Sequence, residues 1–241
     1  MKMIRRAAVA IALLFTPAAF AQTYIVPEGD CGAVTLHVTR GTDFANLGES
    51  IAADRVTDAY VYLPKEKLAA KLTDGPGSLT FNVNVPDVTR HANGAVDGVV
   101  TAGVDLKPEV SSNETRTEHA KALIFCGAKT PIADWVRSAG LGLEIYPQGW
   151  NGPRPRLKAG DTMRFIAVDK ATNKMIQDPP MELYRAGAGR IAEGVSAQYG
   201  GMNFRYPEPG RYMVVTTYRR ADPQQPEHWL VDISTLTFDI K

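Results

Sequence analysis

Hydrophobic and polar residues alternate along much of this chain with a period of two, the repeat expected of β-strands. The clearest run is Leu79–Val85, in which Leu79, Phe81, Val83 and Val85 share one face and polar residues lie between them. Similar runs recur about every ten residues between clusters of Gly, Pro and Asp, which favours short strands joined by turns. The other predicted strands are Ala33–Thr39, Ala59–Leu63, Val96–Val104, Glu118–Cys126, Leu141–Tyr146, Thr162–Asp169, Met181–Tyr184, Met202–Tyr206, Arg211–Tyr218 and Leu230–Phe238.

This spacing is typical of β-sandwiches rather than of alternating βαβ units. It predicts an all-β fold of two immunoglobulin-like antiparallel β-sandwich domains with minor short helices. The candidate helices are Tyr62–Leu72 and Lys129–Arg137. Turn residues at 138–140 mark a boundary, so we expect an N-terminal β-sandwich domain over 22–138 and a C-terminal immunoglobulin-like β-sandwich domain over 139–241.

Two local patterns and one proline refine this prediction. The run Leu141–Tyr146 is expected to stop at Pro147. A turn over 207–210 before Tyr212 resembles the tyrosine corner of immunoglobulin-like sandwiches, in which the Tyr hydroxyl bonds to the upstream backbone; a plain buried core tyrosine is the alternative. Residues 187–192 match the pattern G-x-G-x-x-A, but an all-β context favours a hairpin loop over a dinucleotide site.

Residues 1–21 carry the pattern of a secretory signal peptide. Three basic residues precede an apolar run over 7–15, and Ala19-Phe20-Ala21 fits the small-residue cleavage pattern, so we expect cleavage before Gln22. The apolar run is shorter than the ~20 residues that a transmembrane helix needs, and an uncleaved N-terminal anchor is the alternative. We therefore expect a periplasmic protein that has no integral membrane segment after cleavage.

Composition limits the partners. The 241 residues include 27 Lys and Arg against 26 Asp and Glu, a net charge of +1 that becomes −2 once residues 1–21 and their three basic side chains are removed. A chain so close to neutrality is poorly suited to neutralising a phosphate backbone, so we expect no nucleic-acid partner. The hydrophobic fraction of 44% is ordinary for globular proteins and excludes wholesale disorder.

The chain has two cysteines, Cys31 and Cys126. An even number of cysteines in an exported chain usually pairs, and closing so long a loop stabilises by about 4–5 kcal/mol in the chain-entropy model. The chain has no CxxC motif of the kind found in redox catalysts, so we expect a structural disulfide between Cys31 and Cys126. Two reduced, buried thiols are the alternative, which titration of free thiols in the unfolded protein would reveal.

Several motifs, taken in their order and spacing, resemble a periplasmic family that is a domain of unknown function associated with nickel and cobalt uptake. They are His119-Ala120-Lys121-Ala122-Leu123-Ile124, Leu141-Gly142-Leu143-Glu144-Ile145-Tyr146-Pro147, Lys158-Ala159-Gly160-Asp161-Thr162-Met163-Arg164-Phe165 and Glu208-Pro209-Gly210-Arg211-Tyr212. The resemblance covers about half of the mature chain. It implies immunoglobulin-like β-domains and an extracytoplasmic accessory role, with a divalent transition metal as a ligand by analogy only.

The chain also departs from that family. Members commonly begin the mature chain with a His close to a Trp, whereas this chain begins with residues 22–27, which contain neither. Many members have Gly-His before a phenylalanine, where this chain has Gly41-Thr42-Asp43-Phe44. We therefore predict no cofactor and do not carry metal transport over. His119, on the family-like strand, is the one weak candidate for a metal ligand, and a histidine held by a surface hydrogen bond is the alternative.

The loop after the strand at 141–146 is the candidate ligand site. Tyr146, Trp150 and Asn151 offer two aromatic rings and an amide, which could stack on and hydrogen-bond a sugar or a planar ligand. The alternative is that Trp150 fills the junction between the domains, since large aromatic side chains are usually buried.

These patterns include no catalytic motif such as G-x-S-x-G or HExxH, so we predict no catalytic residues. The leading interpretation is a non-enzymatic periplasmic binding or accessory protein that serves an envelope uptake system for a metal or a small ligand. Its partner would be an envelope transport component or that small ligand. The alternative is a carbohydrate-binding module or an envelope hydrolase that uses the Tyr146–Trp150 loop.

Overall fold

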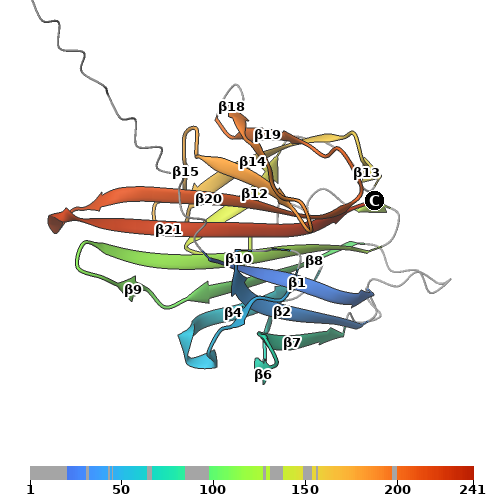
Figure 1. The fold of residues 1–241 in the computed structure, drawn as a ribbon, viewed down its shortest axis with the longest axis horizontal. Helices are drawn as coiled ribbons and strands as arrows, with labels where there is room; N and C mark the ends of the chain where they lie inside the picture. The colour runs from blue at the N-terminus through green and yellow to red at the C-terminus, as the bar shows by residue number, and fades with distance from the viewer. Residues whose placement is uncertain are drawn as a thin grey trace, which may run out of the picture.

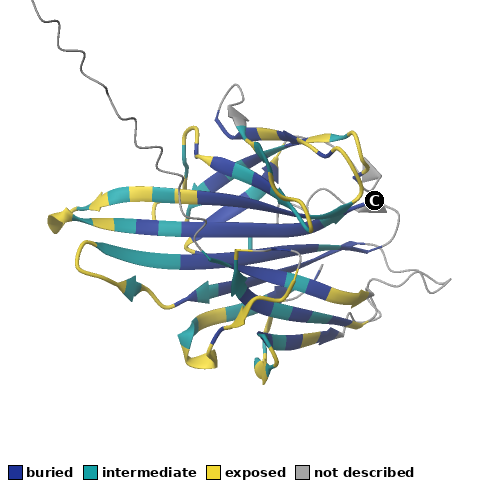
Figure 2. Cartoon of the chain, in the orientation of Figure 1, coloured by how far each residue is buried: buried dark blue, intermediate teal, exposed yellow. Residues whose placement is uncertain are grey.

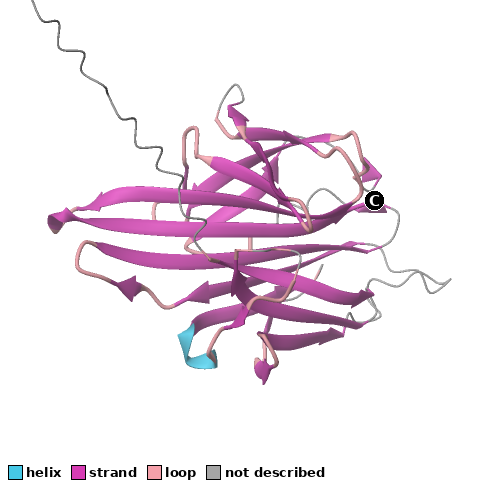
Figure 3. Ribbon diagram, viewed as in Figure 1, coloured by secondary structure: helices cyan, strands magenta, loops and turns pink. Residues whose placement is uncertain are grey.

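The fold is all-β, as the alternating pattern predicts. The computed structural model describes residues 21–30, 33–42, 44, 46–63, 67–84, 98–126, 129–130, 138–148, 154–155, 157–196 and 200–241. Within these residues the only helical element is a 3-10 turn, η1 (Ala53–Arg55), and strands make up most of the rest (Figure 3). None of the described residues forms a helix with the length and hydropathy needed to cross a membrane.

The largest sheet draws strands from both halves of the chain. Its members are β4 (Val56–Tyr62), β5 (Lys67–Ala69), β8 (Gly98–Leu106), β9 (Glu109–Val110), β10 (Glu114–Cys126), β16 (Met181–Arg185), β17 (Gly189–Glu193), β20 (Gly210–Asp222) and β21 (Gln225–Ile240). In the described part of the chain the nine strands follow the order β17-β16-β20-β21-β10-β8-β4-β5, and β9 pairs with β10. The two halves meet where β10 and β21 pair in parallel, while the other pairs are antiparallel.

Two smaller antiparallel sheets pack on this central sheet. The first contains β1 (Gln22–Asp30), β2 (Ala33–Gly41), β3 (Glu49–Ser50), β6 (Thr73–Gly75) and β7 (Ser78–Asn84). The second contains β12 (Leu143–Gln148), β14 (Thr162–Asp169), β15 (Lys174–Met175), β18 (Val195–Ser196) and β19 (Met202–Arg205). A separate short pair joins β11 (Lys129–Thr130) to β13 (Arg154–Pro155). In Figure 1 the first sheet lies below the central sheet and the second lies above it.

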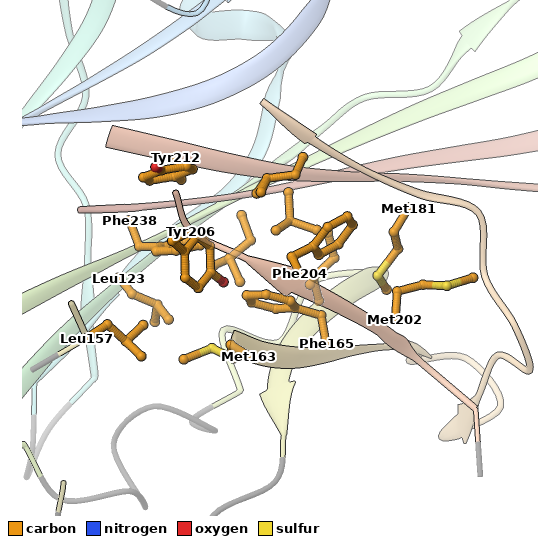
Figure 4. Close-up of a cluster of buried hydrophobic side chains, with 14 of the residues drawn as sticks. Leu123, Leu157, Met163, Phe165, Met181, Met202, Phe204, Tyr206, Tyr212 and Phe238 are labelled. Atoms are coloured by element: carbon orange, nitrogen blue, oxygen red, sulfur yellow. The ribbon is translucent and has the colours of Figure 1, made fainter. Parts of the chain in front are cut away.

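Each smaller sheet encloses a hydrophobic core against the central sheet. Under the first sheet, the core is mainly aliphatic and contains one phenylalanine, Phe81, beside residues such as Leu36. Under the second sheet, the core includes a cluster of aromatic rings: Phe165 stacks on Phe238 with ring centroids 5.7 Å apart, and Phe204 packs beside Phe165 (Figure 4). Figure 2 shows buried residues running along the middle of the central sheet, as expected for a sheet covered on both faces.

The tyrosine corner is confirmed. Tyr212 is fully buried, and its hydroxyl donates to the carbonyl oxygen of Glu208 at 2.5 Å. The neighbouring Tyr206 is equally buried, with ring centroids 5.1 Å apart, but its hydroxyl oxygen has no hydrogen-bond partner among the described residues. The corner thus combines one satisfied and one unsatisfied phenol.

These two tyrosines give a matched pair of variants. Tyr212→Phe is expected to lower the free energy of unfolding by about 1 kcal/mol, because it removes a buried hydrogen bond. Tyr206→Phe is expected to be neutral or stabilising, because it removes a buried polar atom that lacks a partner. Urea denaturation of both variants measures the difference, and equal losses would contradict the assignment of the corner.

Two local predictions are wrong. Tyr62–Leu72 is not a helix, because Lys67–Ala69 forms strand β5 and pairs with Tyr60–Tyr62 of β4. Pro147 does not end its strand, because β12 continues to Gln148. β12 lies at the edge of the second sheet, where a residue without an N–H can face away from the ladder. Of the second candidate helix, Lys129–Thr130 is strand β11 and residues 131–137 lie outside the described residues.

The other local predictions fare differently. The G-x-G-x-x-A segment is the hairpin between β16 and β17, with Gly187 and Gly189 both at positive φ.

Cys126 ends β10, and the described residues contain no free cysteine, but Cys31 lies outside them, so its pairing stays a prediction. Residues 1–20 are also outside the described range. The predicted domain boundary at 138/139 falls between β11 and β12. Segments before and after this boundary both contribute strands to the central sheet.

Candidate functional site

Strand β10 carries an unusual run of charged residues through the centre of the fold. Glu118, His119 and Lys121 are all buried, although such residues are rarely buried unless they are paired. Since successive side chains of a strand point to opposite faces, Glu118 faces the first sheet, whereas His119 and Lys121 face the second. The hydrogen bonds described below agree with this division.

His119 lies between two carboxylates. Its Nδ1 is 2.5 Å from Oδ1 of Asp105 in β8, and its Nε2 is 3.3 Å from Oδ1 of Asp232 in β21. Arg220 in turn pairs with the other oxygen of Asp232. Burial disfavours the charged ring, but the hydrogen bonds to the two aspartates outweigh burial and raise the pKa of His119 to about 9. At neutral pH the ring is therefore protonated.

A protonated ring with two carboxylate partners has no lone pair to offer. His119 would act as a metal ligand or as a general base only after losing a proton and at least one of these hydrogen bonds. Among the described residues, no group of three or more His, Cys, Asp or Glu side chains is arranged to hold a metal ion. The metal role of His119 stays a prediction made by analogy.

Lys121 forms a buried ion pair with Glu144. The Nζ atom is 2.6 Å from Oε1 of Glu144, and both side chains are 0% exposed. Burial lowers the pKa of Lys121, although the Glu144 carboxylate acts to raise it. Burial acts to raise the pKa of Glu144, but the Lys121 ammonium outweighs burial and lowers that pKa. The lysine also lies 4.4 Å from the centre of the Tyr146 ring.

Glu144 accepts hydrogen bonds from the segment that precedes β12 and from Tyr146 within β12. Its Oε1 accepts the backbone N–H of Ala139 at 2.6 Å, and its Oε2 accepts the hydroxyls of Ser138 at 2.9 Å and Tyr146 at 2.8 Å. The backbone N–H of Gly140 also donates to Oε2, at 3.2 Å. One carboxylate therefore fixes the chain where it enters the second half.

The two family-like motifs pack directly on each other. Lys121 pairs with Glu144, and two residues before each of them His119 contacts Gly142, which directly precedes β12. A Cβ atom at Gly142 would lie 2.6 Å from Cε1 of His119, so only glycine leaves room for the ring. The His-x-Lys pattern of β10 and the Gly-x-Glu pattern that leads into β12 therefore reflect direct packing between the two segments.

The opposite face of β10 holds the first sheet by its edge strand, β1. Glu118 accepts both the backbone N–H and the hydroxyl of Thr23, at 2.9 and 2.6 Å, and pairs with Arg40 and Arg116. The hydroxyl of Thr235 donates to the carbonyl of Thr23. Side chains of the central sheet thereby satisfy backbone groups that an edge strand otherwise leaves open.

A polar surface lies where the two halves meet. We define the junction surface as Tyr62, Lys67, Ser138, Tyr146 and Lys170. Lys170 donates to the hydroxyl of Ser138 at 3.2 Å, and the Tyr62 hydroxyl lies 3.5 Å from the position of a Cβ on Gly140.

The tyrosines and lysines of this surface influence each other. The Nζ atom of Lys67 lies 5.2 Å from the centre of the Tyr62 ring, and the hydrogen bond that this ammonium donates to the tyrosine oxygen raises the pKa of the exposed lysine. Burial and the Glu144 carboxylate raise the pKa of Tyr146, which keeps it a neutral phenol. Two ammonium groups and two phenols are thus presented together with a serine hydroxyl.

The structure brings together only part of the predicted site. Tyr146 is half-buried on the junction surface, whereas Trp150 and Asn151 lie outside the described residues. Asp105, Asp232 and Tyr62 were missed, because none belongs to a recognisable motif and each approaches the site from a distant part of the chain. The charged residues inside an otherwise β-like run at 118–121 were the available signal.

Comparison of the sequence with models of known protein families gave no match, and comparison with curated proteins also gave none. The similarity to the nickel- and cobalt-uptake family therefore rests on the motifs at residues 119–124, 141–147, 158–165 and 208–212 alone.

Proposed function

We propose that this protein is an exported, non-enzymatic binding or accessory protein of the bacterial periplasm, and that it recognises its ligand or partner at the junction surface. In this role it would serve an envelope uptake system for a metal or a small ligand. The observation that carries the proposal is the gathering of Tyr62, Lys67, Tyr146 and Lys170 from both halves of the chain onto one surface.

The chemistry of this surface supports recognition. Phenol and ammonium groups on a rigid sheet supply hydrogen bonds and positive charge without needing to move. The buried charges beneath it are engaged in the fold, since Lys121 pairs with Glu144 and both nitrogens of His119 contact carboxylates. The predicted contribution of Trp150 is tested separately below, because residues 149–153 lie outside the described part of the chain.

The test is to recover the full chain from the periplasm under native conditions and to measure its mass and metal content. We expect a bound small molecule, anion or partner protein, and expect the double variant Lys67→Gln and Lys170→Gln to lose it. The matched control replaces Lys158 and Lys174, two exposed lysines elsewhere, by glutamine. An unliganded wild-type chain without a co-purifying protein would overturn the proposal, as would measurable turnover.

Trp150 provides a second prediction. Trp150→Ala is expected to reduce the occupancy of whatever co-purifies while leaving the melting temperature unchanged, because an aromatic ring in a binding loop contributes to contact rather than to the core. Native mass spectrometry and thermal denaturation are the two measurements. A large fall in melting temperature would instead support a tryptophan that plugs the junction.

A carbohydrate ligand is the second candidate. Tyr60 lies beside Tyr62, with the Nζ atom of Lys67 at 3.5 Å from its ring centre, so three tyrosines and a lysine border the same surface. Aromatic rings with neighbouring hydrogen-bond donors suit the apolar faces of sugars. Saturable binding on a glycan array that is lost in Tyr62→Ala would favour this candidate over a metal or a transport component.

A further inference from the structure

Strand β17 is the last strand of the central sheet. Among the residues that the structure describes, it pairs with β16 alone, which leaves its other edge without a partner strand. The N–H of Gly194 donates to the carbonyl of Met181 at 2.8 Å, which makes this pair a hydrogen-bonded one. Because hydrogen-bonded and non-bonded pairs alternate in an antiparallel ladder, the backbone groups of Glu193 face away from β16. No other strand in the described part of the chain pairs with them.

An open depression lies beside this edge. It is lined by Ile191 and Ala192 of β17, Arg205 of β19 and Pro207. The register of β16 and β17 shifts at Leu183/Tyr184, so Ile191 is the extra residue of a bulge and its side chain departs from strict alternation. Three apolar side chains and one guanidinium therefore surround a hollow at the end of the sheet.

Arg205 is unusual among the arginines of this region. Arg185 pairs with Glu208 and Arg211 with Asp239. Arg190 pairs with both Glu182 and Glu193. Within the described part of the chain, Arg205 has no ion-pair partner. A cation beside an apolar hollow favours an occupant that supplies both a carboxylate and an apolar side chain.

We propose that this edge of β17 binds an extended segment of another protein, which adds as a strand and places an aliphatic side chain in the depression and a carboxylate on Arg205. A peptide strand uses all three features: backbone groups at Glu193, the apolar hollow and the guanidinium. A small amphipathic anion would use only the hollow and Arg205. The shortness of β17 and its bulge restrict indiscriminate pairing, so the depression supplies the selectivity.

The probe is a fluorescent hexapeptide of alternating valine and threonine that ends in glutamate, titrated with the full chain by fluorescence anisotropy. Saturable binding is expected. Replacing the glutamate by glutamine and amidating the C-terminus is expected to weaken binding about tenfold, as for loss of a charge-assisted hydrogen bond. Peptides with only one of the two changes identify which carboxylate Arg205 prefers.

Two pairs of variants make the test specific. Glu193→Pro removes the outward N–H and is expected to weaken binding about tenfold. Glu193→Ala removes the carboxylate and its exposed ion pair with Arg190 but keeps the N–H, so it is expected to bind as the wild type does. Arg205→Gln is expected to abolish the preference for the acidic peptide, and Arg205→Lys to retain it. Absence of saturable binding to the wild type, or equal binding by Glu193→Pro and Glu193→Ala, would overturn the proposal without affecting the junction surface.

Discussion

Replacing Glu144 by alanine is expected to lower the free energy of unfolding by about 3–5 kcal/mol, the usual effect of removing one partner of a buried ion pair. The variant leaves the Lys121 ammonium in the core without its carboxylate, and it also removes the acceptor for two backbone N–H groups and two hydroxyls. Urea denaturation followed by circular dichroism measures the change.

The two partners are not equivalent, which gives an internal control. Lys121→Met leaves Glu144 with its four other donors, so we expect a smaller loss than for Glu144→Ala. The double variant Lys121→Met and Glu144→Leu should recover part of the loss, because it leaves no charge of the pair buried. A Glu144→Ala variant as stable as the wild type would show that the pair contributes little.

Raising the pH from about 6.5 to above 9 is expected to remove about 3 kcal/mol of stability through His119, an order-of-magnitude value from the difference between its two pKa values. The pKa of about 9 in the folded state lies above the ordinary value of 6.5. The folded state therefore holds the proton more tightly. Its contribution is complete below pH 6.5 and is lost as the pH rises through 9.

Other groups also titrate at high pH, so the measurement is a comparison. The stability of the wild type and of His119→Gln is measured by urea denaturation between pH 6 and pH 10. The wild type should lose the additional stability over this window, and Asp105→Asn should shift the loss to lower pH because it removes the nearest carboxylate. Parallel curves for the wild type and His119→Gln would contradict the proposed charge state.

Local periodicity was sufficient to predict most strands. The run Thr162–Asp169 coincides with β14, and the hairpin at 187–189 and the corner at Tyr212 were also predictable from turn residues. These features depend on neighbours in the chain, for which alternation and φ preferences carry the information. The failures, at Lys67–Ala69 and Pro147, occurred where pairing with another strand overrode local preference.

The sequence alone therefore determined that the chain is all-β and where most of its longer strands lie. Only the tertiary structure decided that β10 and β21 pair in parallel, that His119 meets Asp232 and that Lys121 meets Glu144. The hydrophobic pattern of a sequence indicates which face of a strand is apolar, but it does not indicate which distant strand lies beside it. Burial makes each of these charges depend on one particular partner, and that partner is chosen by the packing of three sheets.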